Sequence, residues 1–231
     1  MSERHSAVPQ PPRMGSTVAE MPWTRELQNE IVMEFNNITR RKDSLTKSFI
    51  CHYDLKKIWA NIERIRKILY LSNPTDKILL VIQERMYMVL SILVAISAEK
   101  CLEEFTTRFF DKDTGEPRIT DESLPLGYDE IDFLKDDEPH RWQFCREQHM
   151  FKPYVIKLRK FQDIIKIDED YRLPFQKLEE KIGSGSSSTV DRAWISPEYL
   201  IKADQSYYGH VSPLPLWMLF ISNSRSHTKS Q

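Results

Sequence analysis

Glycine, cysteine and net charge are what this sequence has little of. With 6 glycines against 13 prolines in 231 residues, the chain has few freely bending positions and many fixed joints, which favours helices separated by turns. The formal net charge of -1 gives no overall field that would attract nucleic acid or an anionic lipid surface. We therefore expect neither a nucleic acid nor a membrane among its partners.

The cysteines are too few and too scattered to build a covalent or metal-bound framework. Cys51, Cys101 and Cys145 lie far apart, and none belongs to a C-x-x-C pair. This pattern predicts reduced, half-buried thiols, as in a cytoplasmic or nuclear protein. The polar opening residues, MSERHSAVPQPPRMGS, also lack the apolar segment of a secretory signal.

Long hydrophobic runs are missing as well. The longest one, Ile78–Ile96, is interrupted by Gln, Glu and Arg at positions 83–85, whereas a membrane-spanning helix needs ~20 nearly uninterrupted apolar residues. The apolar run at Pro213–Ile221 is shorter still. The first run is therefore predicted to be a core helix, which places it inside a globular protein.

What is present is helical periodicity, in a chain whose hydrophobic content of 40% is ordinary for a globular protein. A first helix is predicted with Thr24 as its N-cap and an apolar stripe on one face. A second, strongly amphipathic helix is predicted over Asp54–Ser72, where Asn73-Pro74 stops it. The stripe of the first helix consists of Leu27, Ile31, Phe35 and Ile38.

The third predicted helix begins at Thr75 or Asp76 and runs to about Phe110. Its middle, Met86–Ile96, is apolar nearly all round, so it should lie at the centre of a helical bundle. Met86 and Met88 are interpreted as core residues, because methionine fills irregular apolar gaps. The basic triplet at residues 40–42 is interpreted as the solvated end of the first helix.

Two further segments carry groups that often bind metals. Asp111–Gly115 begins like a calcium loop, but its glycine is misplaced and no regular helix follows, so a polar turn is expected. A fourth helix is predicted to begin at Asp136–Pro139, to break at Pro153 and to resume over Tyr154–Ile167. It carries His140, Cys145 and His149, which lack a fourth ligand for zinc and are expected to be exposed or hydrogen-bonded.

The segment Leu173–Ile201 changes character. Two short apolar runs flank a Gly/Ser turn, which predicts a β-hairpin. The turn reads Gly183-x-Gly185-x-x-Ser188-x-Val190. Glycines let a backbone approach phosphate groups closely, and the N–H groups of such a turn can face an anion. A Rossmann loop is excluded because no helix follows, and a Walker loop because no Gly-Lys-Ser/Thr is present. A Gly/Ser linker is the plain alternative.

This spacing resembles the G-x-G-x-x-G-x-V loop of protein kinases, with serine in the third glycine place. Residues 138–201, and the helical stretch SNPTDKILLVIQERM, resemble a group of fungal protein-kinase-domain proteins in which a long helical region precedes the kinase fold. The resemblance implies serine/threonine phosphorylation with ATP and Mg²⁺. It also implies a nucleotide-binding loop made of Ile182, Gly183, Ser184, Gly185, Ser186, Ser187, Ser188 and Val190.

The rest of the kinase pattern is not in this sequence. After the loop there is no strand-3 lysine motif, no H-R-D triplet and no D-F-G triplet. Lys202 is the one candidate for the nucleotide lysine, and an exposed loop position is the favoured interpretation. We therefore predict a truncated kinase-like chain that binds no ATP/Mg²⁺ of its own and catalyses nothing. Two alternatives remain: a helical protein–protein interaction module, or a nucleotide-binding protein without catalysis.

The predicted organisation has four parts. Residues 1–21 are expected to be disordered, and residues 22–170 to form a mainly α helical bundle. Residues 171–201 are expected to form a hairpin that corresponds to strands 1 and 2 of a kinase N-lobe. Residues 202–231 have neither helical period nor family likeness and are expected to be disordered. A protein partner, if there is one, is expected to bind the helical region.

Overall fold

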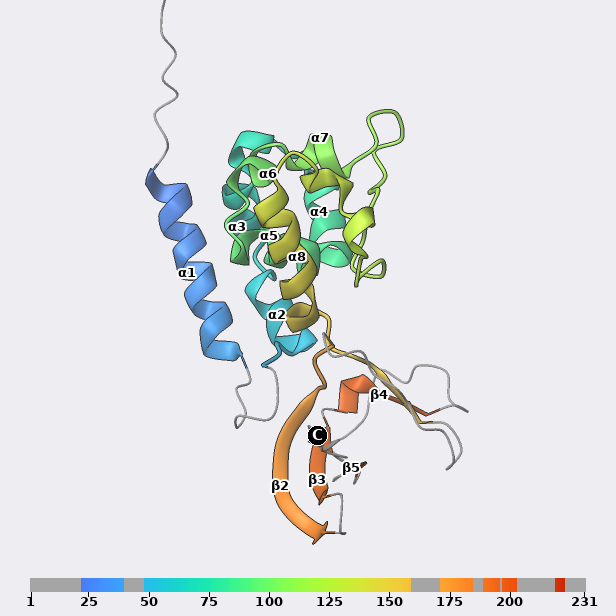
Figure 1. Ribbon diagram of the computed structural model, residues 1–231. Coiled ribbons are helices and arrows are strands. Elements are labelled where there is room, and N and C mark those ends of the chain that lie inside the picture. Colours follow the sequence, from blue (N-terminus) through green and yellow to red (C-terminus); the bar gives the residue numbers. More distant parts are fainter. Residues whose placement is uncertain are drawn as a thin grey trace, which may run out of the picture.

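The structure, a computed structural model, describes residues 22–39, 48–158, 171–184, 189–195, 197–202 and 219–222. In Figure 1 the helices form one group and the strands lie together at one end of it. The fold is mainly helical, as the periodicity predicts. Its α-helices are α1 (Pro22–Ile38), α2 (His52–Ile58), α3 (Ile62–Ile68), α4 (Asp76–Arg85), α5 (Tyr87–Ala95), α6 (Glu99–Glu103), α7 (Phe105–Phe109) and α8 (Glu138–Phe151).

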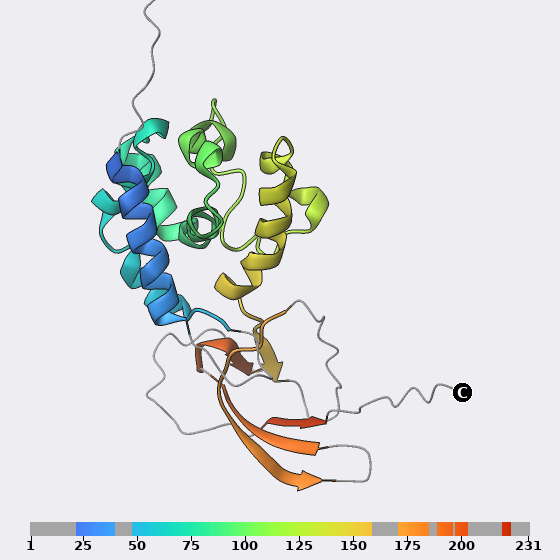
Figure 2. The ribbon, with the colours of Figure 1, turned by 60° about the vertical axis from the view of Figure 1, so that its left-hand side comes forward.

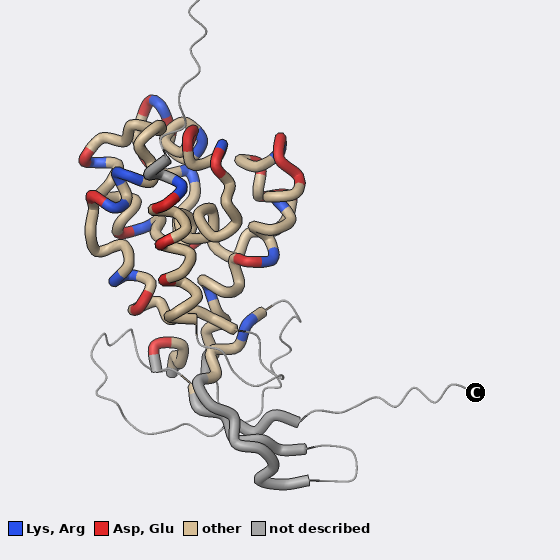
Figure 3. The backbone as a smooth tube through the Cα atoms, turned by 90° about the vertical axis from the view of Figure 1, so that its left-hand side faces the viewer, with Lys and Arg blue, Asp and Glu red and all other residues tan. Residues whose placement is uncertain are grey.

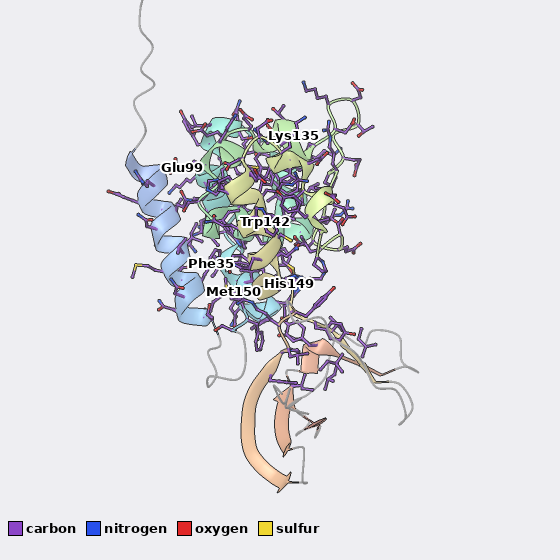
Figure 4. All side chains as sticks on the ribbon, in the orientation of Figure 1. Phe35, Glu99, Lys135, Trp142, His149 and Met150 are labelled. Carbon is purple, nitrogen blue, oxygen red and sulfur yellow. The ribbon has the colours of Figure 1, made fainter. Side chains whose placement is uncertain are left out.

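Helix α1 packs on the group through the predicted stripe. Ile31 and Phe35 are buried, and Phe35 lies between α1 and the rest of the group in Figure 4. The helix begins at Pro22, so the prediction that Thr24 caps it is wrong: proline fits the first turn, where its missing N–H costs nothing. Arg64 on α3 holds the outer side of α1 through its ion pairs with Glu30 and Glu34.

The single helix predicted over residues 54–72 is instead α2, α3 and the 3₁₀ turn η1 (Tyr70–Ser72). The chain leaves the helical path at Trp59, and Asn61 then caps α3 by accepting a hydrogen bond from the N–H of Glu63. The carbonyls of Trp59 and Ala60 accept hydrogen bonds from the amide of Gln83, each at 2.9 Å. A side chain from α4 thus replaces the helical bonds lost at the break.

The single helix predicted from residue 75 to about Phe110 is also broken, into α4, α5, α6 and α7. Helix α4 begins at Asp76, one of the two predicted starts, and Thr75 caps it because its hydroxyl accepts from the N–H of Ile78. Helices α4 and α5 meet at Met86 with a bend of 86°. Helix α5 is followed by Ser97, whose φ of 56° lies in the left-handed region that turns a chain out of a helix.

Helix α5 is the centre of the bundle, as its composition predicts. Its residues Tyr87–Val94 are all buried, and Met86 and Met88 are core residues of the main apolar cluster. Helix α8 packs along α5 and continues the cluster with Phe144 and Phe151. A helix that is buried on every side has no polar face, which is why α5 shows no amphipathic pattern.

Helix α8 begins where predicted and ends earlier. The carboxylate of Asp137 accepts from the N–H of His140, and Pro139 lies in the first turn. After Pro153, however, the chain does not resume a helix: it forms strand β1 (Ile156–Leu158). The prediction of a helix over Tyr154–Ile167 is therefore wrong for its first residues, and residues 159–170 lie outside the described part.

The strands form two small sheets. In one, β1 pairs in parallel with β4 (Leu200–Lys202), which follows the 3₁₀ turn η4 (Pro197–Tyr199). In the other, β3 (Thr189–Ile195) lies between β2 (Phe175–Ser184) and β5 (Leu219–Ser222), antiparallel to both. Strand β5 falls within residues 202–231, where disorder was expected. It differs from that expectation because pairing along β3 gives its backbone groups partners.

Charge is spread evenly over the helical part. In Figure 3 both the positions with Lys or Arg and the positions with Asp or Glu are distributed over the described helical part, in keeping with the net charge of -1. Within the described residues no single helix is long and apolar enough to cross a bilayer; only α4 and α5 taken together reach that composition. Residues 1–21 and 40–42, for which disorder and a solvated helix end were predicted, lie outside the described residues.

Candidate functional site

The Gly/Ser turn lies between two paired strands. Gly183 pairs with Val190, and Ser184 pairs with Thr189. The last of these pairs directly flanks residues 185–188 in the sequence. Of the predicted loop residues, Ile182, Gly183 and Ser184 end β2, and Val190 lies in β3. Gly185, Ser186, Ser187 and Ser188 lie outside the described residues. The flanking backbone is thus that of an antiparallel pair, which aims both strand ends at the same turn.

Strand β2 is longer than the partner segment it faces. The register shifts between Phe175 and Lys177 and again between Glu179 and Gly183, so β2 carries extra residues at both places. Extra residues of this kind bend a strand and increase its twist. Figures 1 and 2 show the result, a curved β2 that extends with β3 away from the helices. The second irregularity lies directly before Gly183 and Ser184, the last described residues of β2.

The other end of the β2–β3 pair is docked on the helical part through apolar contact. Phe175 and Ile195 face each other across the two strands and are both buried. They belong to a second apolar cluster, separate from the main one, which we call the junction cluster. Burial of large apolar side chains supplies most of the free energy of such a contact. The junction cluster consists of Phe49, Cys51, Ile156, Phe175, Ile195 and Tyr199.

Polar contacts reinforce this docking just before β2. The guanidinium of Arg172 donates to the carbonyl of Ser48 and, at 3.4 Å, to the carboxylate of Glu147 on α8. The backbone carbonyl of Arg172 accepts from the N–H of Tyr154 at 2.9 Å. One residue therefore joins the segment before α2, the end of α8 and the start of β2. Burial lowers the pKa of Arg172 from its usual value, and the nearby Glu147 opposes that change.

A buried polar contact joins η4 to the helices. The hydroxyl of Tyr199 accepts from the backbone N–H of His52 at 2.9 Å, and one ring nitrogen of His52 lies 2.6 Å from the hydroxyl of Tyr87. Burial, and then the nearby ammonium groups of Lys56 and Lys152, lower the pKa of His52 to about 4. The imidazole is therefore neutral at pH 7, which suits a hydrogen bond with a neutral hydroxyl.

Lys202 does not join the hairpin sheet. It lies in β4, where its backbone pairs with Leu158 of β1, so it belongs to a strand rather than to the loop that was favoured for it. The free side of β3 is taken instead by β5, whose residues pair with Val190–Ala193. Strand β5, which takes the place beside β3 where a kinase would have its third strand, contains no lysine at residues 219–222.

The cysteine and histidines of α8 lie apart from the turn. Cys145 and His149 line one shallow cavity of about 200 Å³, together with Tyr171, whose ring contacts that of His149. Figure 4 places His149 near the end of α8 from which the chain leaves for the strands. His140 is not with them: it pairs with Asp137 at 2.6 Å. In the described part of the chain no group of three or more His, Cys, Asp or Glu side chains is arranged to hold a metal ion.

The segment that begins like a calcium loop forms a turn. The carboxylate of Asp111 accepts hydrogen bonds from the N–H groups of Asp113 and Thr114 and from the hydroxyl of Thr114. These bonds lower the pKa of Asp111. The carboxylate thus accepts hydrogen bonds from the residues that follow it in the chain, as in other aspartate turns.

Comparisons with protein-family models, with curated proteins and with solved structures give no match for this chain. The likeness to fungal kinases therefore stays a prediction from the sequence. What sequence reasoning missed is the junction itself. Its contacts join segments more than a hundred positions apart, such as Arg172 with Ser48 and Tyr199 with His52. None of these residues belongs to a motif that would have pointed to the contact.

Proposed function

We propose that this chain is a kinase-like protein that keeps the nucleotide-loop hairpin and does not transfer phosphate. The observation that carries the proposal is the pairing of Gly183 with Val190 and of Ser184 with Thr189 around residues 185–188. A protein-kinase glycine loop is also a turn between two antiparallel strands, with a valine just after it. A flexible linker, the plain alternative, has no reason to be flanked by paired strands.

The docking of the hairpin gives further support. A loop that covers phosphates has to be held at its base while its tip stays free to approach the ligand. Phe175 and Ile195 provide that base, since both are buried in the junction cluster with Phe49 and Cys51, just before α2. Ser184 and Thr189 pair at the opposite end of the two strands. The helical part would then serve as the support of the loop.

We expect no catalysis because the sequence lacks the residue motifs that phosphoryl transfer requires. Phosphoryl transfer needs a lysine on the α- and β-phosphates, an aspartate as base, and acidic and amide groups that hold Mg²⁺. None of the motifs that provide them follows residue 190. A two-sided cleft for adenine also requires further strands and a second lobe, and the described residues contain no second lobe. We expect no binding of Mg²⁺–ATP by this chain.

The first test is a direct assay on the purified chain. Isothermal titration with Mg²⁺–ATP should give no binding, and incubation with γ-labelled ATP and a general protein substrate should transfer no label. Label transfer that disappears in Gly185→Asp would contradict the inactive assignment and show that the chain is an active enzyme. Binding without transfer would favour the alternative of a nucleotide-binding protein without catalysis.

The kinase likeness itself needs a test that can succeed. In a chimera, residues 202–231 are replaced by part of a fungal kinase, from its third strand to the end of its catalytic core. This chimera should bind Mg²⁺–ATP. Gly185→Asp should weaken that binding by roughly tenfold or more, because a carboxylate facing phosphates costs more than about 1.4 kcal/mol. Asn29→Asp adds the same charge at an exposed position of α1, and should leave binding unchanged. A folded chimera in which both variants bind alike would refute the hairpin's assignment.

A helical interaction module is the second candidate. It is favoured by large apolar side chains that are exposed on the helical part, among them Leu71 at 53% and Trp142 at 61%. Neighbouring exposed apolar side chains can mark protein contacts, and Leu71 follows Tyr70, which is 49% exposed. Affinity capture with the full chain should then lose a partner when Leu71 or Trp142 is changed to serine, and should keep it when Gly185 is changed to aspartate. The opposite pattern would place the contact at the hairpin.

A further inference from the structure

Asp121 ties three helices together from a buried position. It is 6% exposed, and its N–H donates to the carbonyl of Arg85 at the end of α4, at 2.8 Å. Its carboxylate oxygen Oδ1 accepts from the N–H groups of Met88 and Val89 in the first turn of α5, both at 3.0 Å. Its carbonyl accepts from the ammonium group of Lys152 just after α8, at 2.8 Å. The bend between α4 and α5 and the end of α8 therefore meet at one residue.

The carboxylate is only half satisfied. Within the described part of the chain, its second oxygen, Oδ2, has no hydrogen-bond partner although it is buried. A buried ionised carboxylate with one unbonded oxygen is costly, and protonation relieves much of that cost. Protonation leaves Oδ1 able to accept from α5. The charged groups that act on the Asp121 carboxylate are Lys152, just after α8, and Lys56 of α2. Arg85 of α4 contributes its backbone carbonyl, while its guanidinium pairs with Glu116.

We propose that Asp121 is a proton-dependent latch, which holds the corner of α4, α5 and the end of α8 closed when protonated and loosens it when it ionises. The balance of forces agrees with the geometry. Burial raises the pKa of Asp121 to about 7, against the opposing effect of its bonds with Val89 and Met88 and of Lys152 and Lys56. His52 is neutral in this range, so it does not titrate together with Asp121.

The sign of the pH effect follows from linkage. An unfolded or opened corner exposes an aspartate that ionises near its usual pKa, whereas the closed corner keeps its proton up to about pH 7. Between these values the opened state binds fewer protons, so opening becomes easier as the pH rises. The effect levels off above pH 7, where both states are ionised. The corner should therefore be most firmly closed at mildly acidic pH.

Backbone amides next to the latch report on it directly. In the full chain, NMR shifts of the Met88 and Val89 amide protons should titrate with one midpoint near pH 7, because both donate to the titrating carboxylate. Their hydrogen-exchange protection, corrected for the intrinsic rate, should fall by up to roughly tenfold per pH unit between pH 5 and 6.5. Amide shifts that stay constant from pH 5 to 8.5 would overturn the proposal.

Two variants separate the latch from general stability. Asp121→Asn keeps an acceptor but cannot ionise, so the Met88 and Val89 shifts should no longer titrate and their protection should not depend on pH. Asp111→Asn, on an exposed turn where Asp111 likewise accepts backbone N–H groups, should leave the midpoint unchanged. If Asp121→Asn fails to fold, Lys152→Met provides the test. Loss of the ammonium group should raise the midpoint, and an unchanged or lowered midpoint would contradict the latch.

Discussion

Half-buried His52 and buried Asp121 lie near the same two lysines, and their pKa values are shifted in opposite directions. Burial disfavours the charged form of each, so it lowers the pKa of the imidazole to about 4 and raises that of the carboxylic acid to about 7. Both are therefore neutral in mildly acidic solution, and Lys56 and Lys152 are left as the positive groups of the region. Neither residue belongs to a sequence motif, so its shift is set by its surroundings.

For His52 the stability effect has the opposite sign to that of Asp121. Its folded-state pKa lies below the usual 6.5, so between about pH 6.5 and pH 4 the unfolded state takes up a proton that the folded state refuses. Stability from this residue is present above pH 6.5 and is lost as the pH falls. We expect the wild-type chain to lose about 1 kcal/mol more than His52→Gln between pH 7 and pH 5, allowing for solvent screening.

Urea denaturation at the two pH values measures this difference. His140→Gln is the matched control, since His140 contacts Asp137 at the start of α8 and does not belong to the junction cluster. The prediction fails if His52→Gln and the wild type lose the same free energy of unfolding on acidification.

At the scale of single elements, the starts of α4 and α8 depend on residues next to them in the sequence. The breaks between helices depend on residues that are distant in the sequence. Thr75 caps α4 and Asp137 caps α8, both within reach of their own helices. The breaks at Trp59 and Met86 depend instead on Gln83 and Asp121, which lie more than twenty positions away and bond the freed backbone groups. The helical spacing of apolar residues continues across such breaks. Periodicity alone therefore predicts helices that are longer than those in the structure.

The cap of α8 can be tested alone. Asp137→Ala removes the acceptor of the His140 N–H and leaves one of the first backbone donors of α8 without a partner. We expect a loss of about 1 kcal/mol in the free energy of unfolding, measured by urea denaturation followed by circular dichroism.

Asp136→Ala makes the same change of charge one residue earlier, at an exposed position outside the cap. It should change stability by less than about 0.5 kcal/mol. Equal effects from the two substitutions would mean that α8 responds to charge near its N-terminus rather than to this cap.

At the scale of the whole molecule, two separate apolar clusters stabilise the fold. The main cluster holds the helices together around α5, and the junction cluster holds β1, β2 and β3 against residues 49–51. The junction cluster is far smaller, so less free energy opposes its opening. The strands should therefore come away from the helices before the helices unfold.

Phe175→Ala tests this order. The substitution empties the centre of the junction cluster, and large-to-alanine changes of this kind cost roughly 3–5 kcal/mol of local packing. Limited proteolysis should cut more rapidly within residues 154–202, while the helical circular-dichroism signal and its melting temperature stay near those of the wild type. Phe144→Ala, in the main cluster, should instead lower that melting temperature. A parallel drop in both variants would show that the two clusters unfold as one.

The amino-acid sequence by itself determined the helical class, the buried α5, the stripe of α1 and the cap of α8, because each depends on the spacing of residues within one segment. It also predicted paired strands around the Gly/Ser turn from flanking apolar runs. Only the tertiary structure decided where the long helices break, that the chain turns to a strand after Pro153, and that Phe49, Arg172 and Tyr199 meet at one junction. Those features arise from contacts between distant segments, whose partners have no mark in the local sequence, and so they appear only once the chain is folded.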